Sequence, residues 1–261
     1  MSERFDPAQL ARKAKRWVVK VGTSVLTDGR SGQVTRHGVE GIALEMVSLC
    51  KQGKEVLLVT SGAIGIGMGV LELKTRPSDL AKLQAAAATG QGKLIQWYTS
   101  RMEEEGFHAA QVLLTRGDLE DRQRRLNVKA TLETLLKAGI IPILNENDTV
   151  STEEIRYGDN DLLSAHVASL VGADLLLLLT DVDHLIGPEG PLHQVKEITP
   201  ELERAARGTN KPSSTGGMRS KLEAARIART HGIPMAVMNG RSRVSLAKLL
   251  TEADGRGTWF V

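Results

Sequence analysis

The chain has 261 residues, of which 41% are hydrophobic and 25% charged, and its formal net charge is +3. These values are typical of a globular α/β protein and, with 3% aromatic residues, argue against a disordered or nucleic-acid-binding class. No apolar run is long enough for a signal peptide or a membrane span, and the single cysteine, Cys50, fits a reducing compartment. We therefore expect a cytoplasmic protein that binds neither membranes nor nucleic acid.

Short apolar runs alternate with segments of helical periodicity along the chain. In chain order, the predicted strands are 17–21, 56–60, 110–114, 140–144, 175–179 and 234–238. The predicted helices are 39–50, 80–102, 126–136, 162–171 and 218–228. Several strand runs are apolar at nearly every position, which is typical of parallel strands buried on both faces. The sequence predicts an α/β fold, a three-layer αβα sandwich with a mainly parallel central sheet.

Polar residues and glycines follow four of the predicted strands. They occupy Lys20 to Ser24, Thr60 to Gly62, Asn145 to Asp148, and Thr180 to Asp181. Ligands of open α/β sheets bind beyond the carboxyl ends of the strands. Turn formation explains any one of these segments, but it explains all four together poorly. We expect them to form one site.

The common nucleotide-binding fingerprints are absent. Gly92 and Lys93 are followed by Leu94, and Ala87 stands where a P-loop requires glycine. The glycines between positions 62 and 69 follow a strand, but their spacing does not fit the dinucleotide-binding pattern. These observations argue against both a P-loop kinase and a Rossmann dehydrogenase.

Two lysines have the placement that phosphoryl transfer requires, which is positive charge close to backbone donors. Lys20 interrupts an otherwise apolar strand, where a lysine is normally excluded unless its ammonium reaches a site or the strand is an edge. Lys221 lies one turn into a helix that follows Thr215 to Gly217, so its amine can reach an anion at the helix start or extend into solvent. Backbone N–H groups of residues 22–24 can also meet phosphate oxygens.

Seven segments together form a recognisable pattern. They are VKVGTSVL at 19–26, VTSGAIG at 59–65, LTRGDLEDR at 114–122, NENDTV at 145–150, GDNDLLSA at 158–165, LLLTDV at 177–182 and TGGMRSKLEA at 215–224. In this order they resemble the amino acid kinase family and, within it, its glutamate 5-kinase branch. The single glycine in VKVGTS distinguishes this branch from aspartokinases, acetylglutamate kinases and uridylate kinases, whose first strands end differently.

The resemblance implies ATP-dependent phosphorylation of the γ-carboxylate of L-glutamate, the first step of proline biosynthesis. It implies that Lys20 and Lys221 neutralise charge on the transferred phosphoryl group and that Asp161 holds both amines. The residues implied for glutamate are Ser61, Asp148 and Asn160. The residues implied for the nucleotide are Lys20, Gly22, Thr180, Asp181, Thr215, Gly216, Gly217, Met218, Arg219, Ser220 and Lys221.

The same resemblance implies that Mg2+ is carried by the ATP phosphates, so no protein metal ligand is expected. Glutamate's γ-carboxylate is already ionised at neutral pH, so no general base is required and none of the histidines is assigned a catalytic role. Proline is expected to be a feedback inhibitor that competes with glutamate. Asp118 matches a position that the family associates with feedback, although it also suits a helix cap.

The resemblance also sets the expected organisation. Residues 1–15 are interpreted as a helical N-terminal extension, and residues 16–261 as the kinase domain, whose last strand lies near the C-terminus, without the PUA domain that many members carry. Residues 183–190 depart from the family's GLYTADP segment, which affects the expected nucleotide preference. Homologous kinases suggest a homo-oligomer, either a dimer or a tetramer.

Two other functions stay open. The same fold could phosphorylate another small acidic amino acid, although VKVGTS, TSGAIG and NEND together favour glutamate. The chain could instead be a catalytically silent nucleotide-binding regulator. The presence of Lys20, Lys221 and Asp161 argues against such a regulator.

Overall fold

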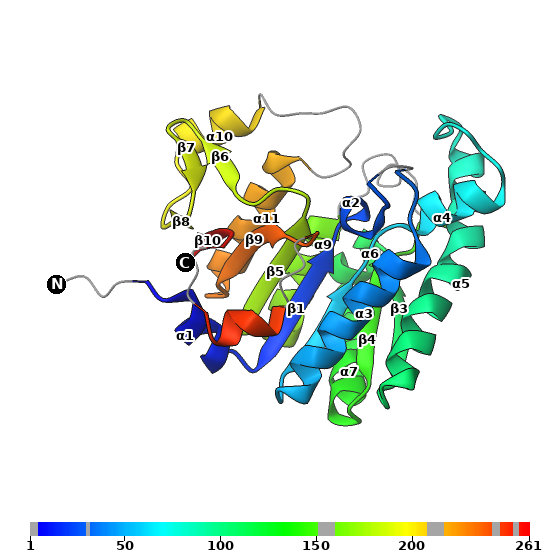
Figure 1. Cartoon of the computed structure of the whole chain (residues 1–261), viewed down its shortest axis with the longest axis horizontal. Coiled ribbons are helices and arrows are strands. Elements are labelled where there is room, and N and C mark those ends of the chain that lie inside the picture. Colours follow the sequence, from blue (N-terminus) through cyan, green and yellow to red (C-terminus); the bar gives the residue numbers. More distant parts are fainter. Residues whose placement is uncertain (1–4, 30–31, 151–159, 208–216, 242–245, 253–255) are drawn as a thin grey trace.

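The structure is a computed structural model, and it describes residues 5–29, 32–150, 160–207, 217–241, 246–252 and 256–261. A central sheet of eight strands has the order β3-β4-β2-β1-β5-β9-β10-β8 (Figure 1). All neighbouring strands are parallel except the β9–β10 pair. The strands are β1 Arg16–Val21, β2 Glu55–Val59, β3 Ala109–Leu114, β4 Ile141–Glu146, β5 Leu175–Thr180, β8 Gln194–Val195, β9 Met235–Asn239 and β10 Thr258–Phe260.

Helices cover both faces of this sheet (Figure 1). One face carries α1, α3, α5 and the 3-10 helix η1, and the other carries α7, α9, α10 and α11. The helices are α1 Pro7–Lys13, α2 Thr23–Leu26, α3 Arg36–Lys51, α4 Ala63–Val70, α5 Leu80–Glu104, α6 Arg116–Glu120, α7 Arg122–Lys137, α9 Asn160–Val171, α10 Pro200–Arg207, α11 Met218–Thr230 and η1 Leu246–Leu250. The predicted three-layer αβα sandwich with a mainly parallel sheet is confirmed.

The two hydrophobic cores follow from strand alternation. In β1, Trp17 and Val19 face the core under α3 and α5, whereas Val18 faces the core under α9 and α11. Because both faces are covered, side chains of either parity must be apolar, and this produced the continuous apolar runs in the sequence. Each of the six strands and five helices predicted from those runs is present, with ends that differ by a few residues.

The apolar runs did not predict the shortest strands, and the N-terminal helix was expected on other grounds. A two-stranded sheet of β6 Leu185–Gly187 and β7 Gly190–Leu192 occupies the segment that departs from the family pattern. The predicted N-terminal helix is present as α1, and its Ala8 and Ala11 are buried. The Lys54 amine donates to the carbonyl oxygens of Ala11 and Arg12 at 3.1 and 2.9 Å. The helix therefore packs as part of the folded body.

Glycines allow α4 and α5 to pack in close contact with each other. A Cβ added at Gly67 would lie 1.8 Å from the carbonyl oxygen of Ala86, and one at Gly90 would lie 1.9 Å from that of Ala63. Either methyl group would force the two helices apart. These glycines, which match no nucleotide motif, thus position the start of α4. No helix in the described part of the chain is long and apolar enough to cross a membrane.

Candidate active site

The carboxyl ends of four parallel strands meet at one edge of the sheet, as the polar segments predicted. The register pairs Lys20 of β1 with Val59 of β2 on one side and with Leu178 of β5 on the other. Lys20 therefore lies in the middle of the sheet and only 8% of it is exposed. The alternative of an edge-strand lysine is wrong, since β1 is a central strand.

A buried carboxylate joins the two predicted lysines. Lys20 Nζ lies 2.6 Å from Asp161 Oδ1, and Lys221 Nζ lies 3.0 Å from Asp161 Oδ2. The lysines come from β1 and from the first turn of α11, and Asp161 comes from the first turn of α9. Lys221 is 6% exposed, so the alternative of a solvated surface lysine is also wrong. The structure brings these three predicted residues together.

The charges in this cluster do not cancel. Burial by itself raises the pKa of Asp161, but the charges and hydrogen bonds of Lys20 and Lys221 outweigh burial and hold this pKa well below its ordinary value. Among these three side chains, one carboxylate lies between two ammonium groups in a place with little solvent. Two ammonium groups held side by side favour binding of an anion.

The start of α11 contains five of the residues that the resemblance implies for the nucleotide, Gly217 to Lys221. Ser220 Oγ lies 2.8 Å from Asp161 Oδ2 and 2.9 Å from the Gly217 carbonyl oxygen, so its hydroxyl faces the cluster. The Met218 side chain packs in the hydrophobic core, while Arg219 is exposed. Gly217 is the N-cap and makes no side-chain capping bond among the described residues, and the first N–H groups of a helix have no partner within the helix. Thr215 and Gly216 lie outside the described residues.

Of the backbone donors predicted after β1, the N–H of Gly22 is not available. The N–H of Gly22 bonds to the Leu179 carbonyl oxygen at 3.1 Å and continues the β1–β5 pairing, so it is not available to a phosphate. The N–H groups of Thr23 and Ser24 lie in the first turn of α2, where helix geometry leaves such donors without intrahelical partners. An added Cβ at Gly22 would lie 3.6 Å from Lys20 Nζ, so glycine leaves space beside this amine.

A cavity of about 100 Å³ opens beside the lysine cluster and contains all three residues predicted for glutamate, together with others that were not. The Asn160 side chain lines this cavity and is 6% exposed. Asn160 Nδ2 is 2.8 Å from the Thr60 carbonyl oxygen, 2.9 Å from Ser61 Oγ and 3.1 Å from Asn145 Oδ1. Asn160 Oδ1 has no hydrogen-bond partner among the described residues. This buried acceptor is therefore suited to a ligand N–H group.

Three charged residues line the cavity, Arg76, Glu146 and Asp148. Burial raises the pKa of Asp148 to about 6, although the positive charge of Arg76 opposes this shift. A carboxylate that is costly to ionise gains from a cationic ligand group, and Arg76 is suited to a carboxylate. Sequence reasoning missed Arg76 because it lies in a loop with no periodic pattern or motif.

The entrance to α4 completes this cavity. Gly62, the N-cap of α4, has φ of 103°, a left-handed conformation that favours glycine. A Cβ there would also lie 3.3 Å from a methyl carbon of Val34 and 3.4 Å from one of Leu26. Gly62 thus allows the sharp turn after β2 that places Ser61 at the cavity wall.

The predicted nucleotide residues Thr180 and Asp181 follow β5, where Thr180 Oγ1 lies 3.2 Å from Asp181 Oδ1. Asp181 is exposed and Thr180 is half-buried. Beyond them, Asp183 Oδ1 accepts a hydrogen bond of 3.0 Å from Asn239 Nδ2, and the rings of His184 and His193 meet edge to face at 4.5 Å. The segment that departs from the family pattern is thus tied to the adjacent strand β9.

Comparisons with known proteins identify relatives of this chain. The model of the amino acid kinase family matches residues 15–239. Glutamate 5-kinase of Moorella thermoacetica is 49% identical, over 100% of this chain and 70% of its own length. Glutamate 5-kinase of Symbiobacterium thermophilum is 46% identical, over 95% of this chain and 97% of its own length. This chain spans 66% of the length of a third relative, glutamate 5-kinase 1 of Rhizobium meliloti.

A solved structure shows the same fold. Carbamate kinase of Giardia matches with a TM-score of 0.64 over 95% of this chain and 99% of its own chain, at 17% identity. At this identity the likeness concerns the fold alone. The family model and the Moorella and Symbiobacterium relatives carry the further conclusion that this chain belongs to the amino acid kinase family.

Proposed function

We propose that the chain transfers the γ-phosphoryl group of ATP to the γ-carboxylate of L-glutamate and forms L-glutamyl 5-phosphate. The observation that carries this proposal is the Lys20–Asp161–Lys221 cluster beside a small cavity with carboxylate- and amine-binding groups. The names of the relatives that are 49% and 46% identical support glutamate as the acceptor.

Each end of glutamate has a suitable group in the cavity. Asp148 is suited to the α-ammonium group, because a bound cation offsets the cost of its ionisation. The buried Asn160 Oδ1 can accept a second N–H of the same group. Ser61 and Arg76 offer a hydroxyl and a guanidinium to the α-carboxylate. The γ-carboxylate would then point toward the lysine cluster, since Asn160 and Asp161 are adjacent in α9.

In the proposed reaction a γ-carboxylate oxygen attacks the γ-phosphorus of ATP. The bond from this phosphorus to the β–γ bridging oxygen breaks, and ADP leaves with that electron pair. The acceptor is already ionised near neutral pH, so no proton has to be removed. Lys20 and Lys221 would stabilise negative charge on the phosphoryl oxygens in the transition state, while Asp161 fixes their positions.

The N–H groups at the starts of α2 and α11 would bind the ATP phosphates, with Thr180 and Asp181 near the nucleoside. Mg2+ carried by ATP would neutralise part of the phosphate charge, and no residue of this chain is assigned to hold it. The carboxylate of Asp161 is engaged by two lysines, so it is not assigned to the metal. This fits a cation that is carried by ATP.

The proposal is tested by ADP release with L-glutamate, L-aspartate and N-acetyl-L-glutamate as acceptors. We expect glutamate-dependent ADP release and a product that hydroxylamine converts to the γ-hydroxamate. ADP release with another acid alone would replace glutamate as the acceptor. No ADP release with any acid, in a chain that still binds ATP, would favour the regulator.

Proline inhibition is a further part of the proposal. Proline shares an α-carboxylate and an amino nitrogen with glutamate, so it can use the same polar groups. Asp118 caps α6 and accepts hydrogen bonds from the Thr115 N–H and hydroxyl at 2.8 and 2.7 Å, and it pairs with Arg124 at 3.3 Å. These contacts support a structural role, through which Asp118 would shape the loop after β3.

Free proline is expected to compete with glutamate, and Asp118→Asn should weaken inhibition while kcat changes by less than about threefold, or about 0.7 kcal/mol. Proline titrations at several glutamate concentrations test both points. Absent inhibition in the parent, or identical inhibition in the variant, would remove this part. A dimeric or tetrameric state and a cytoplasmic location stay predictions.

A further inference from the structure

A second cavity lies away from the sheet edge just described. Its volume is about 370 Å³, within the range of small-molecule sites, and it lies between α7, α9 and the residue that follows α11. Ser169 and Leu170 line it, nine positions along α9 from Asn160 and Asp161, which is about 14 Å at the helical rise. The two cavities share no lining residue. They are separate sites.

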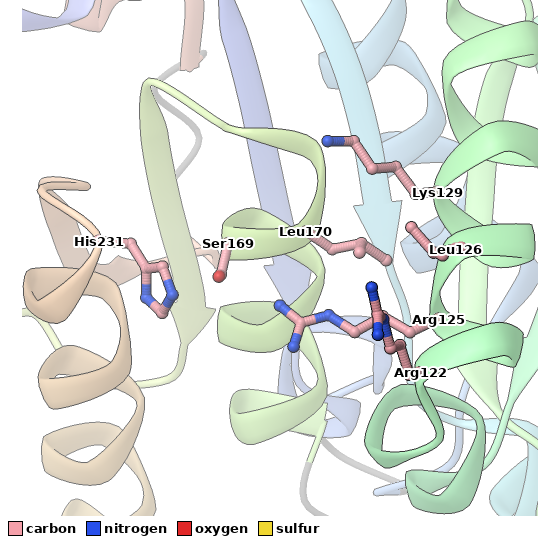
Figure 2. Close-up of a pocket in the computed structure, with 7 residues that line it drawn as sticks. All are labelled: Arg122, Arg125, Leu126, Lys129, Ser169, Leu170 and His231. Carbon is pink, nitrogen blue, oxygen red and sulfur yellow. The ribbon is translucent and has the colours of Figure 1, made fainter.

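Basic side chains form one wall of this second cavity. Arg122, Arg125 and Lys129 line it from α7, and His231 lines it from the opposite side. Figure 2 shows Arg122 and Arg125 on α7, with the guanidinium group of Arg125 extending toward α9 and His231 beyond Ser169. His231 Nδ1 lies 2.9 Å from the Ile227 carbonyl oxygen, which orients the ring.

The charges on this wall are poorly balanced. Neither Arg122 nor Arg125 pairs with a carboxylate among the described residues, in contrast to Arg124, which pairs with Asp118. Lys129 contacts Glu133 only at 3.8 Å. Partial burial and then the positive charges of Arg125 and Arg116 lower the pKa of His166, one turn before Leu170, although Glu120 opposes them. The groove therefore has a positive potential.

The position of these arginines in α7 also favours an anion. Arg122, Arg124 and Arg125 lie in the first turn, which contains no acidic residue, and the two carboxylates at this helix start, those of the N-cap Asp121 and of Asp118, both bond to Arg124. The N-terminus of a helix already carries partial positive charge, so cations there are unfavourable. An anion bound by Arg122 and Arg125 would offset this effect.

Apolar surface lies beside the charges. Leu126 is 52% exposed, an unusual fraction for a leucine, and it lines the cavity together with the buried Leu170. An inorganic anion would leave this surface in water and most of the volume unused. An organic group attached to the anion would cover the leucine side chains.

We infer that the groove between α7 and α9 is a binding site for a small organic phosphate, in which Arg122 and Arg125 bind the phosphate group and Leu126 and Leu170 contact the organic part. Guanidinium groups match phosphate oxygens in a bidentate geometry, and a phosphate monoester carries close to two negative charges at neutral pH. Ser169 and His231 supply further donors. The inference does not depend on the proposed kinase activity.

The test uses phenyl phosphate, inorganic phosphate and benzyl alcohol as probes of the whole chain, with and without saturating ADP. Binding is followed by calorimetry and by amide chemical shifts of Ser169 and His231. We expect phenyl phosphate to bind more tightly than inorganic phosphate, benzyl alcohol not to bind, and ADP to leave the phenyl phosphate affinity unchanged. Competition by ADP, or shifts confined to the Asn160 cavity, would overturn the inference.

Matched variants identify the residues. Arg125→Gln should weaken phenyl phosphate about tenfold, whereas Lys137→Gln, the same charge change three turns along α7, should not. Leu126→Asn should weaken phenyl phosphate and leave inorganic phosphate unaffected. Equal weakening by both charge variants would mean nonspecific attraction. A change of oligomeric state in Arg125→Gln without phosphate binding would identify a subunit contact instead, and the proposed site would be wrong.

Discussion

Asp161 and Asp148 lie at the same edge of the sheet, and their surroundings change their ionisation in opposite directions. Two lysines keep Asp161 ionised despite its complete burial, whereas burial raises the pKa of Asp148 to about 6 despite Arg76. The carboxylate of Asp161 has its cationic partners within the protein and can hold them in place. The carboxylate of Asp148 would be stabilised in its ionised form by a bound cation. These divergent pKa values support the proposed division between a positioning role for Asp161 and a binding role for Asp148.

The largest effect is expected at Asp161. Asp161→Asn leaves two buried ammonium groups without their carboxylate, and breaking a buried ion pair costs about 3–5 kcal/mol. The pKa of Asp161 is depressed, so its contribution to stability is present above the unfolded pKa of about 4 and is lost only below it. We expect a lower Tm, by a difference that stays constant from pH 5 to 8, together with loss of ADP release.

Thermal unfolding at several pH values measures this difference. Glu223→Gln, which removes an exposed carboxylate from α11, is the matched control and should leave Tm nearly unchanged. If Asp161→Asn were as stable and as active as this control, the carboxylate would have no organising role.

Lys221→Ala separates the role of one amine from that of the cluster. Its ammonium is expected to stabilise charge that develops on the transferred phosphoryl group, so kcat should fall by about 100-fold or more, with a smaller change in glutamate KM. Steady-state kinetics with both substrates measures the two effects. A near-normal kcat would remove Lys221 from the proposed mechanism, and Lys221→Arg tests whether charge alone is sufficient.

Asp148 should show the pH dependence that Asp161 lacks. As pH falls through about 6, Asp148 takes up a proton and loses its attraction for the glutamate ammonium group, so kcat/KM for glutamate should fall. Asp148→Ala should raise glutamate KM far more than ATP KM. Asp148→Asn should remove the Asp148 component of the pH profile, which distinguishes it from titration of the ATP γ-phosphate. An equal rise in both KM values would point to a folding defect.

The same raised pKa has a stability consequence of opposite sign. A folded-state pKa above the unfolded value means that the folded protein binds the proton more tightly, so stability falls as pH rises from about 4 to 6, and above about pH 6 this loss stays constant. Asp148→Asn should therefore raise Tm at pH 8 more than at pH 5. The exposed-residue control Glu223→Gln should show no such trend, and neither should Asp161→Asn.

The sequence predicted the sheet well because both of its faces are buried, which makes the strands continuous apolar runs. It also predicted the site through Lys20, since a lysine within such a run needs a reason to be there. Periodicity could not pair Lys20 with Asp161, which lies far away in sequence, and this pairing came from the family resemblance. Arg76 lies in a loop without a pattern. Gly67 and Gly90 were visible as glycines, but only the packing of α4 on α5 explains them.

The smallest effect is expected at Ser220, which contacts Asp161 but not Asp148. Its hydroxyl lies 2.8 Å from Asp161 Oδ2, and the residue is 8% exposed, so it supports the carboxylate that already has two lysine partners. A hydrogen bond to a charged group is worth about 1.5–3 kcal/mol, and the lysines should retain most of the geometry when it is lost.

We therefore expect Ser220→Ala to lower Tm modestly and kcat by about tenfold or less, with glutamate KM and its pH dependence unchanged, because Asp148 is unaffected. Thermal unfolding and kinetics from pH 5.5 to 8 measure all three. Ser220→Thr, which keeps a hydroxyl, should recover more activity than alanine if its methyl group is accommodated. A large rise in glutamate KM in Ser220→Ala would show that the two carboxylates are coupled, and the separation of positioning from binding would then fail.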